Sequence, residues 1–318
     1  MYRKEIKVTD CTIRDGGLIN KWQFSDELVR RVFLAVNESG VDYMEIGYRA
    51  SKKMFDPKEY GPWRFSTDEK IREIIQDTPV KVKLGVMVDI GRVESEDIAQ
   101  CSESPLDVIR VATYLKDIDK AIALANECDA KGYETFINIM AISSVSDADL
   151  AAGLKQVDAE TNVTAVNIVD SFGALYSESV HHLVKIYQDN LTKHEVGMHA
   201  HNNQQLGFAN TIEAIRKGAN YLDATISGIG RGAGNCPLEL LLGFLKNPKF
   251  NLEPVLEILE DTFLELRKEI EWGYLIPYMI SGILNEHPRT AIALRQSDRK
   301  DKYVEFYRTM TTPECIGD

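Results

Sequence analysis

Eight apolar runs with strand character recur along the chain. They are rich in Val, Ile and aromatic residues, and several are continuous rather than alternating. Continuous apolar runs are typical of parallel strands that are covered on both faces. Parallel neighbours need crossover connections, which are usually helices. The runs span residues 7–13, 41–48, 82–88, 107–113, 134–141, 165–170, 195–201 and 221–229.

Amphipathic helical patterns separate most of these runs. The clearest, 26–38, ends at Gly40, and Ser66 with Glu69 forms a capping box before the helix expected at 68–76. The other patterns cover residues 116–131, 148–159, 177–188, 204–217 and 237–245, and 94–101 is the weakest crossover. The alternation predicts an α/β fold, a (β/α)8 TIM barrel whose catalytic groups lie at the carboxyl ends of the strands. The structural alternative is a doubly wound open sheet, but no G-x-G-x-x-G turn follows the first strand.

The periodicity changes after Leu245. Residues 252–272 predict one long helix, 273–284 are apolar and aromatic, and 289–302 are basic and polar. We therefore expect a barrel domain over residues 1–246 and a C-terminal helical extension over 247–318. The extension would pack over the barrel mouth, reach a partner subunit, or do both.

Charge and composition exclude several classes of function. The net charge of -12 argues against a general affinity for nucleic acid or anionic membranes. No apolar run is long enough to span a bilayer, and the N-terminus has no basic and apolar leader. Five scattered cysteines without a C-x-x-C pair are typical of reduced thiols. These features predict a soluble cytoplasmic protein without disulfides.

Two histidines lie one residue apart at the end of the seventh run. On a strand, His199 and His201 point to the same face, so their imidazoles can share one ion. Barrel closure makes the seventh, eighth and first strands neighbours, and Asp15 after the first strand is the natural third ligand. Asn235, at the end of a glycine-rich loop after the eighth strand, is a possible fourth. That loop is either a turn that lets Asn235 reach inward or a phosphate cradle.

This ligand set predicts a catalytic metal rather than a structural one. Two imidazoles and one carboxylate leave coordination positions open for water or substrate, and they suit Mn2+, Co2+, Fe2+ or Zn2+, with Mg2+ less favoured. Arg14, beside Asp15, would stabilise an enolate oxygen, or instead pair with a carboxylate such as Asp170.

Three segments resemble one family. The Thr-Ile-Arg14-Asp15-Gly segment, the His199-Ala-His201-Asn-Asn segment and the Gly-Ile-Gly-Arg-Gly-Ala-Gly-Asn235 loop resemble the metal-dependent pyruvate aldolase and HMG-CoA lyase-like superfamily. The resemblance covers residues 1 to about 245. It implies that Asp15, His199 and His201 bind a divalent metal, with Mn2+ foremost, that Asn235 lies nearby, and that Arg14 polarises the substrate's keto oxygen.

Within that superfamily, the chain is most similar to the 4-hydroxy-2-oxovalerate aldolase branch. The resemblance implies that Ser171 holds the carboxylate of pyruvate and that Tyr274 and Tyr278 border the active site, although both tyrosines could equally serve the core. One departure concerns the catalytic base, because Leu18 stands where these aldolases have a histidine. A metal-bound hydroxide, Tyr48 or Glu45 could replace it, and Glu45 could instead orient a ligand.

The connection at residues 49–65 is long for a strand-to-helix loop and is a candidate lid. Its basic residues could meet an anionic substrate, or it could be a solvated charged loop. The residues placed to do so are Arg49, Lys52, Lys53 and Arg64.

The sequence favours a divalent-metal-dependent class II aldolase that cleaves or forms the C–C bond of a 4-hydroxy-2-oxoacid, giving pyruvate and an aldehyde. Two alternatives remain open. One is a lyase or Claisen-type synthase that acts on acyl-CoA, and the other is a non-catalytic barrel that assembles with a partner enzyme. A homo-oligomer, or an aldehyde-accepting partner bound through the C-terminal helices, is compatible with each of these functions.

Overall fold

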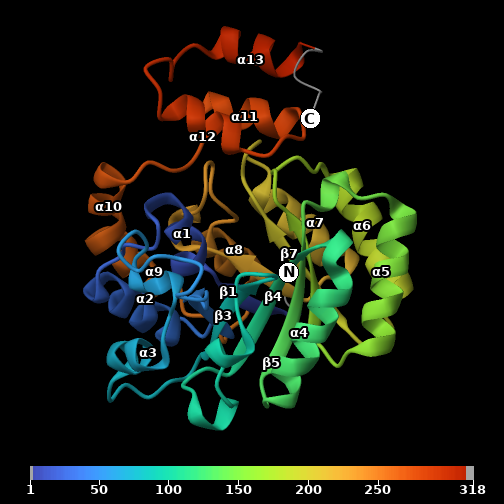
Figure 1. Ribbon diagram of the computed structural model, residues 1–318. Coiled ribbons are helices and arrows are strands. Elements are labelled where there is room, and N and C mark those ends of the chain that lie inside the picture. Colours follow the sequence, from blue (N-terminus) through green and yellow to red (C-terminus); the bar gives the residue numbers. More distant parts are fainter. Residues whose placement is uncertain (1–2, 313–318) are drawn as a thin grey trace.

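The computed structural model describes residues 3–312 and is a closed barrel of eight parallel strands (Figure 1). Each strand pairs with the next in sequence, and β8 closes the barrel on β1, with Lys7 opposite Tyr221 and Asp10 opposite Ala224. The predicted (β/α)8 barrel is thereby confirmed. The strands are β1 Lys7–Asp10, β2 Tyr43–Tyr48, β3 Lys83–Asp89, β4 Val108–Tyr114, β5 Glu134–Met140, β6 Ala165–Asp170, β7 Glu195–Ala200 and β8 Tyr221–Ala224.

The helices pack around the barrel, and their apolar faces join its core. Helix α2, for example, spans the predicted residues and begins where the Ser25 hydroxyl accepts a hydrogen bond from the Leu28 amide. The barrel helices are α1 Thr12–Asn20, α2 Asp26–Glu38, α3 Asp68–Ile75, α4 Ile118–Ala130, α5 Asp147–Glu160, α6 Ser177–Asn190, α7 Gly207–Lys217 and α8 Leu238–Leu245.

The barrel interior is apolar at one end and charged at the other. Tyr43, Phe136 and Tyr221 lie near the amino ends of their strands, and the ring centroid of Phe136 is 5.5 Å from those of both tyrosines. Further along the strands the inward positions include buried Glu45, Arg110, Asn138 and Asp223. The aromatic plug keeps the carboxyl ends as the accessible face for ligands.

Three local predictions were wrong. Within residues 90–107, all of which are described, the crossover from β3 to β4 contains only two 3-10 turns, because this polar stretch has only two fully buried apolar side chains, Ile98 and Leu106. Thr67 rather than Ser66 caps α3, by accepting from the Lys70 amide. The long helix expected at 252–272 is interrupted by a π-helical segment and ends before Trp272.

The first strand is shorter than predicted, which changes how the Arg14-Asp15 pair is presented. β1 ends at Asp10 and α1 begins at Thr12, so Gly16 and Gly17 lie in a helix and not in a turn. The indole of Trp22 packs where a Gly17 side chain would be and donates a hydrogen bond from Nε1 to the Arg14 carbonyl at 2.9 Å. Trp22 therefore fixes the first turns of α1 at the barrel mouth.

The C-terminal helices divide between two apolar clusters. Val255 and Ile258 of α9 join the barrel core, whereas Tyr278, Ala291 and Phe306 form a second cluster with Ala233 of the β8 loop. Figure 1 shows α11, α12 and α13 together as a separate layer above the barrel. The division at residues 246 and 247 stays a prediction. The segments are α9 Glu253–Ile258, the π segment Leu259–Phe263, α10 Leu264–Glu269, α11 Ile276–Ile283, α12 Arg289–Arg295 and α13 Tyr303–Thr311.

No helix among residues 3–312 is both long and apolar enough to cross a membrane. Four of the cysteines lie in this range and are free thiols, as expected. The fifth, Cys315, lies outside the described residues.

The packing of Trp22 on α1 predicts opposite effects for two glycine substitutions. In Gly17→Ala the new methyl would lie 2.0 Å from the indole, so we expect a loss of about 1–3 kcal/mol in the free energy of unfolding. That loss exceeds the gain of about 1 kcal/mol in helix propensity. Gly243→Ala, in α8 with nothing within 4 Å, should be neutral or stabilising. Thermal unfolding checks both, and equal stability of the two variants would contradict this packing.

Candidate active site

Three predicted ligands meet at the carboxyl end of the barrel. Asp15 comes from the first turn of α1, His199 from β7, and His201 follows β7 directly. One ligand atom from each lies within 4.8 Å of the others, and all three side chains are buried. The α1 start places Asp15 there because β1 ends next to β8 and close to β7.

The polar atoms at this point fit a divalent cation. Asp15 Oδ2 and His199 Nε2 are 3.2 Å apart, yet both are buried without a hydrogen bond, and so is Asn235 Oδ1. Asn235 pairs with His201 through a backbone bridge, and its Nδ2 donates to the Ile229 carbonyl, which leaves Oδ1 as an acceptor. Buried acceptors without partners are costly unless a ligand satisfies them. Imidazole nitrogen and carboxamide or carboxylate oxygen suit Mn2+, Co2+, Fe2+ or Zn2+.

The protonation states of two of the three ligands also favour a cation. Burial would lower the pKa of the third, His199, but its contacts with the Asp15 and Asp223 carboxylates raise that pKa. Burial would raise the pKa of Asp15, but the Arg14 guanidinium and the imidazoles hold it well below its ordinary value. Burial, reinforced by Arg231, holds the pKa of His201 well below its usual range, so this ring is neutral. An ionised carboxylate and a neutral imidazole are the forms that bind metal.

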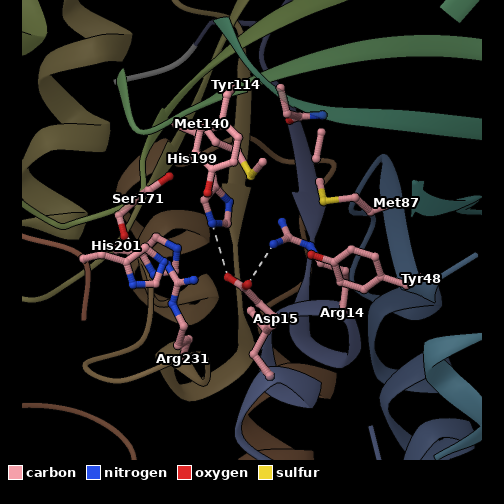
Figure 2. A pocket seen from close by; sticks show the side chains of 15 residues that line it. Arg14, Asp15, Tyr48, Met87, Tyr114, Met140, Ser171, His199, His201 and Arg231 are labelled. Carbon is pink, nitrogen blue, oxygen red and sulfur yellow. Dashed lines mark hydrogen bonds and ion pairs between the residues drawn. The ribbon is translucent and has the colours of Figure 1, made fainter. Parts of the chain in front are cut away.

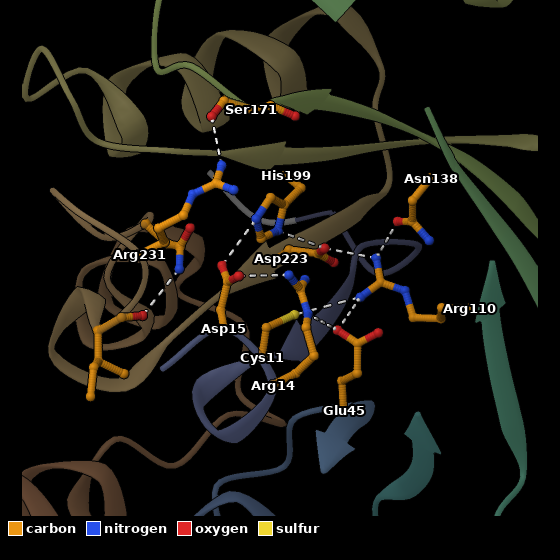
Figure 3. A network of polar contacts seen from close by, with 12 residues as sticks. Cys11, Arg14, Asp15, Glu45, Arg110, Asn138, Ser171, His199, Asp223 and Arg231 are labelled. Atoms are coloured by element: carbon orange, nitrogen blue, oxygen red, sulfur yellow. Dashed lines mark hydrogen bonds and ion pairs between the residues drawn. The ribbon is translucent and has the colours of Figure 1, made fainter. Parts of the chain in front are cut away.

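Two of the ligands, Asp15 and His199, belong to a closed ring of buried charged and polar side chains (Figure 3). Arg14 donates to Asp15 and to Glu45, both at 2.7 Å, and Arg110 contacts Glu45 at 3.2 Å and Asp223 at 2.7 Å. Asp223 Oδ2 lies 3.0 Å from His199 Nδ1, which returns the ring to Asp15. The pairs compensate each other's burial, because an isolated charge at these positions would cost several kcal/mol.

The ring orients the ligands. The Asp223 carboxylate fixes the Nδ1–H tautomer of His199 and so leaves Nε2 free to face Asp15 and a cation. The two carboxylates that hold Arg14 are Asp15 and Glu45, so the alternative pairing with Asp170 is wrong. Glu45 in turn is held by the guanidinium groups of Arg14 and Arg110, a geometry that favours the orienting role over that of a base.

One cavity opens onto this centre, and Figure 2 shows its lining. Arg14 and Tyr48 lie on one side of the Asp15 and His199 pair, and Ser171 and Arg231 lie on the other. Leu18 also lines the cavity, so the position without a histidine does face the substrate site. Burial raises the pKa of the Tyr48 phenol, which therefore keeps its proton at neutral pH.

Other sequence-predicted residues lie elsewhere. Tyr274 is 51% exposed, and Tyr278 is buried against Gly232 and Ala233, so neither lines the cavity. Their role in substrate binding stays a prediction, although Tyr278 supports the loop that carries Arg231 and Asn235.

The four basic residues expected to meet a substrate are engaged within the protein and do not line the cavity. Arg49 pairs with Asp68, Lys53 pairs with Glu94 and Glu96, and Lys52 lies 6.0 Å from the Phe65 ring. Arg64 is buried against Phe55, Tyr48 and Trp22, with its guanidinium 4.2–4.7 Å from the ring centroids. Their expected contact with an anionic substrate is therefore not seen.

Four residues of the site were missed in the sequence. Arg110 and Asp223 are charged residues inside apolar strand runs, and that pattern was a usable signal, because buried charges need partners. Arg231 was hidden in the glycine-rich loop. His287 reaches the cavity from the connection between α11 and α12, and no spacing linked it to the barrel.

Curated proteins that resemble the chain include two kinds of enzyme. A 4-hydroxy-2-oxovalerate aldolase from Thermus thermophilus is 30% identical over 251 residues, which cover 79% of this chain and 71% of that protein. An oxaloacetate decarboxylase from Mycobacterium tuberculosis is 29% identical over 245 residues, which cover 76% of this chain and 70% of that protein.

Solved structures and a family model agree with the barrel fold. The N-terminal domain of a proposed aldolase from Bacteroides vulgatus has a TM-score of 0.78 and 29% identity, covering 94% of this chain and all of that one. The carboxyl transferase domain of Rhizobium etli pyruvate carboxylase shares the fold, with a TM-score of 0.71 at 12% identity, 97% of this chain and 56% of that one. The model of the HMGL-like family matches residues 5–260. The chain therefore belongs to the HMGL-like family of lyases.

Proposed function

We propose that the protein is a divalent-metal-dependent class II aldolase that cleaves or forms the C3–C4 bond of a 4-hydroxy-2-oxoacid, with Mn2+ as the preferred metal. The observation that carries the proposal is a group of buried ligand atoms without partners. They lie on Asp15 and His199, which line the cavity, and on Asn235, whose backbone pairs with that of His201. The aldolase from Thermus thermophilus supports the reaction class.

The chemistry follows from the charges around the cavity. In cleavage, the 4-hydroxyl loses its proton, the C3–C4 electron pair passes to the pyruvate unit as an enolate, and an aldehyde leaves. A bound divalent ion would supply Lewis acidity at the 2-keto group. Arg14 uses Nε and Nη1 for carboxylates, which leaves Nη2 as the donor for the enolate oxygen among the described contacts.

Ser171 and Tyr48 would complete the site. Ser171 Oγ accepts a hydrogen bond from the Ala141 amide at 2.8 Å, so its hydroxyl hydrogen is free to donate to the substrate carboxylate. Tyr48 keeps its proton and would donate it to the alkoxide oxygen in the condensation direction. Leu18 has no titratable group, which excludes it as the base.

Decarboxylation of a 2-oxoacid that carries a second carboxylate on C3, as oxaloacetate does, is the second candidate function, favoured by the similarity to the oxaloacetate decarboxylase from Mycobacterium tuberculosis. It would give the same pyruvate enolate, with carbon dioxide leaving in place of the aldehyde. The same Arg14 and Ser171 contacts would serve it. Cytoplasmic location, and a homo-oligomer or partner enzyme bound through the C-terminal helices, stay predictions.

Removal of a ligand side chain tests the metal site. We expect Asp15→Asn and His201→Gln to lower Mn2+ affinity and to reduce pyruvate release from 4-hydroxy-2-oxopentanoate to background. His201 stands outside the charge ring, so His201→Gln should unfold at the wild-type temperature even if Asp15→Asn does not. Calorimetric titration with Mn2+ and a coupled pyruvate assay measure both effects. Full activity in His201→Gln would refute the ligand assignment.

Ser171→Ala tests the carboxylate contact. Loss of one hydrogen bond to a charged group should lower kcat/KM about 10- to 100-fold and leave Mn2+ affinity unchanged. Ser144→Ala, at an exposed serine outside the cavity, is the matched control. Equal kinetics for the two variants would show that Ser171 does not contact the substrate.

A further inference from the structure

Arg231 differs from the other arginines at the centre of the site. Arg14 and Arg110 each contact two carboxylates of the charge ring. Arg231 contacts no carboxylate among residues 3–312. Its Nη2 donates to the Ser171 carbonyl at 3.0 Å, and its Nε is buried without a partner. A largely desolvated guanidinium with unused donors is poised for an anion, because its planar fork matches a carboxylate.

His287 lies on the same cavity and adds a neutral donor. Burial, followed by the charges of Arg231 and Arg289, lowers the pKa of His287 to about 4, so the ring is neutral at pH 7. Its Nδ1 accepts the Arg289 backbone amide at 3.2 Å, so the ring hydrogen is on Nε2. The cavity is thus faced by one charged donor, Arg231 from the β8 loop, and one neutral donor, His287 from the C-terminal layer.

The charges at the site balance one another without Arg231, so its positive charge is uncompensated. The ring holds three carboxylates and two guanidinium groups, a net charge of one negative, which a divalent ion converts to one positive. The carboxylate of a 2-oxoacid neutralises that remainder. The Asp170 carboxylate accepts hydrogen bonds from the Ala174 and Leu175 amides, and among residues 3–312 it forms no ion pair with Arg231. A second negative charge would be needed to neutralise Arg231.

We propose that Arg231 and His287 form a subsite for a second carboxylate, so that the preferred substrate is a dicarboxylic 2-oxoacid. The inference rests on the proposed function and narrows it to 4-hydroxy-2-oxo diacids, whose cleavage gives pyruvate and an aldehyde that bears the second carboxylate. Arg231 takes that carboxylate through its free nitrogens, and His287 adds Nε2–H. The enolate oxygen would then bind on the opposite side of the cavity, beside Arg14.

Binding of two unreactive five-carbon acids tests the subsite without turnover. 2-Oxopentanoate and 2-oxoglutarate share the 2-oxoacid end, lack the 4-hydroxyl, and differ by a terminal methyl or carboxylate. Calorimetry on the Mn2+-loaded protein should show 2-oxoglutarate binding about tenfold tighter or better. Arg231→Gln should remove most of this preference and change 2-oxopentanoate affinity less than about twofold. His287→Ala should reduce it severalfold, which provides a second variant if Arg231→Gln fails to fold.

Arg289→Gln is the matched control, because it removes one positive charge beside His287 from an exposed position outside the cavity. It should keep the preference for the diacid. No preference in the wild type, or equal weakening of both acids by Arg231→Gln, would overturn the subsite; the latter would place Arg231 on the shared carboxylate.

A comparison of pyruvate release from 4-hydroxy-2-oxopentanoate and 4-hydroxy-2-oxoglutarate separates the two proposals. If 2-oxoglutarate binds selectively but neither hydroxy acid releases pyruvate, the carboxylate subsite is supported and the aldolase function is refuted. If pyruvate is released but Arg231→Gln keeps the preference for the diacid, the aldolase function is supported and the subsite is refuted.

Discussion

The ion pair between Arg14 and Asp15 is the contact on which the site depends. Each is buried in the first turn of α1, and neither could be there alone, because a desolvated charge without its partner costs several kcal/mol. Arg14 needs a second carboxylate, Glu45, and Glu45 needs Arg110. Arg110 also pairs with Asp223, Asp223 contacts His199, and His199 lies beside Asp15, which closes the ring. The ligand positions are thus set by charge compensation as well as by packing.

Barrel closure makes this ring possible. The six members come from β2, β4, β7, β8 and α1, and these elements face one another only when β8 pairs with β1. The aromatic plug of Tyr43, Phe136 and Tyr221 fills the other end, so the charges are buried at the end where strands meet their loops. The cavity beside Asp15 and His199 is then the opening through which a small molecule would reach these residues. The fold provides rigidity, and the ring holds Arg14, Asp15 and His199 in fixed positions beside the cavity.

The C-terminal layer contributes to the site as well as covering it. Tyr278 packs on the loop that carries Arg231 and Asn235, and Asn203, two residues after His201, donates to the Tyr278 carbonyl. The connection after α11 brings His287 to the cavity. The sequence placed this layer near the mouth but directed attention to Tyr274, which is half exposed. A residue that reaches a site from a separate layer has no periodic relation to the barrel, so its place depends on tertiary packing.

The sequence by itself determined the barrel and four candidate ligand positions. Apolar runs of strand length and the alternation of His199 and His201 are local properties, and a closed eight-stranded order follows from them once each strand takes the next as its neighbour. Asp15 and Asn235 followed from the same closure. The tertiary structure alone decided which charged groups pair. Arg14 pairs with Glu45 rather than Asp170, and the loop cations contact acids and aromatic rings of the protein. Arg231 contacts no acid among the described residues. Pairing of charges depends on distances and burial across the barrel, and these exist only after the chain has folded.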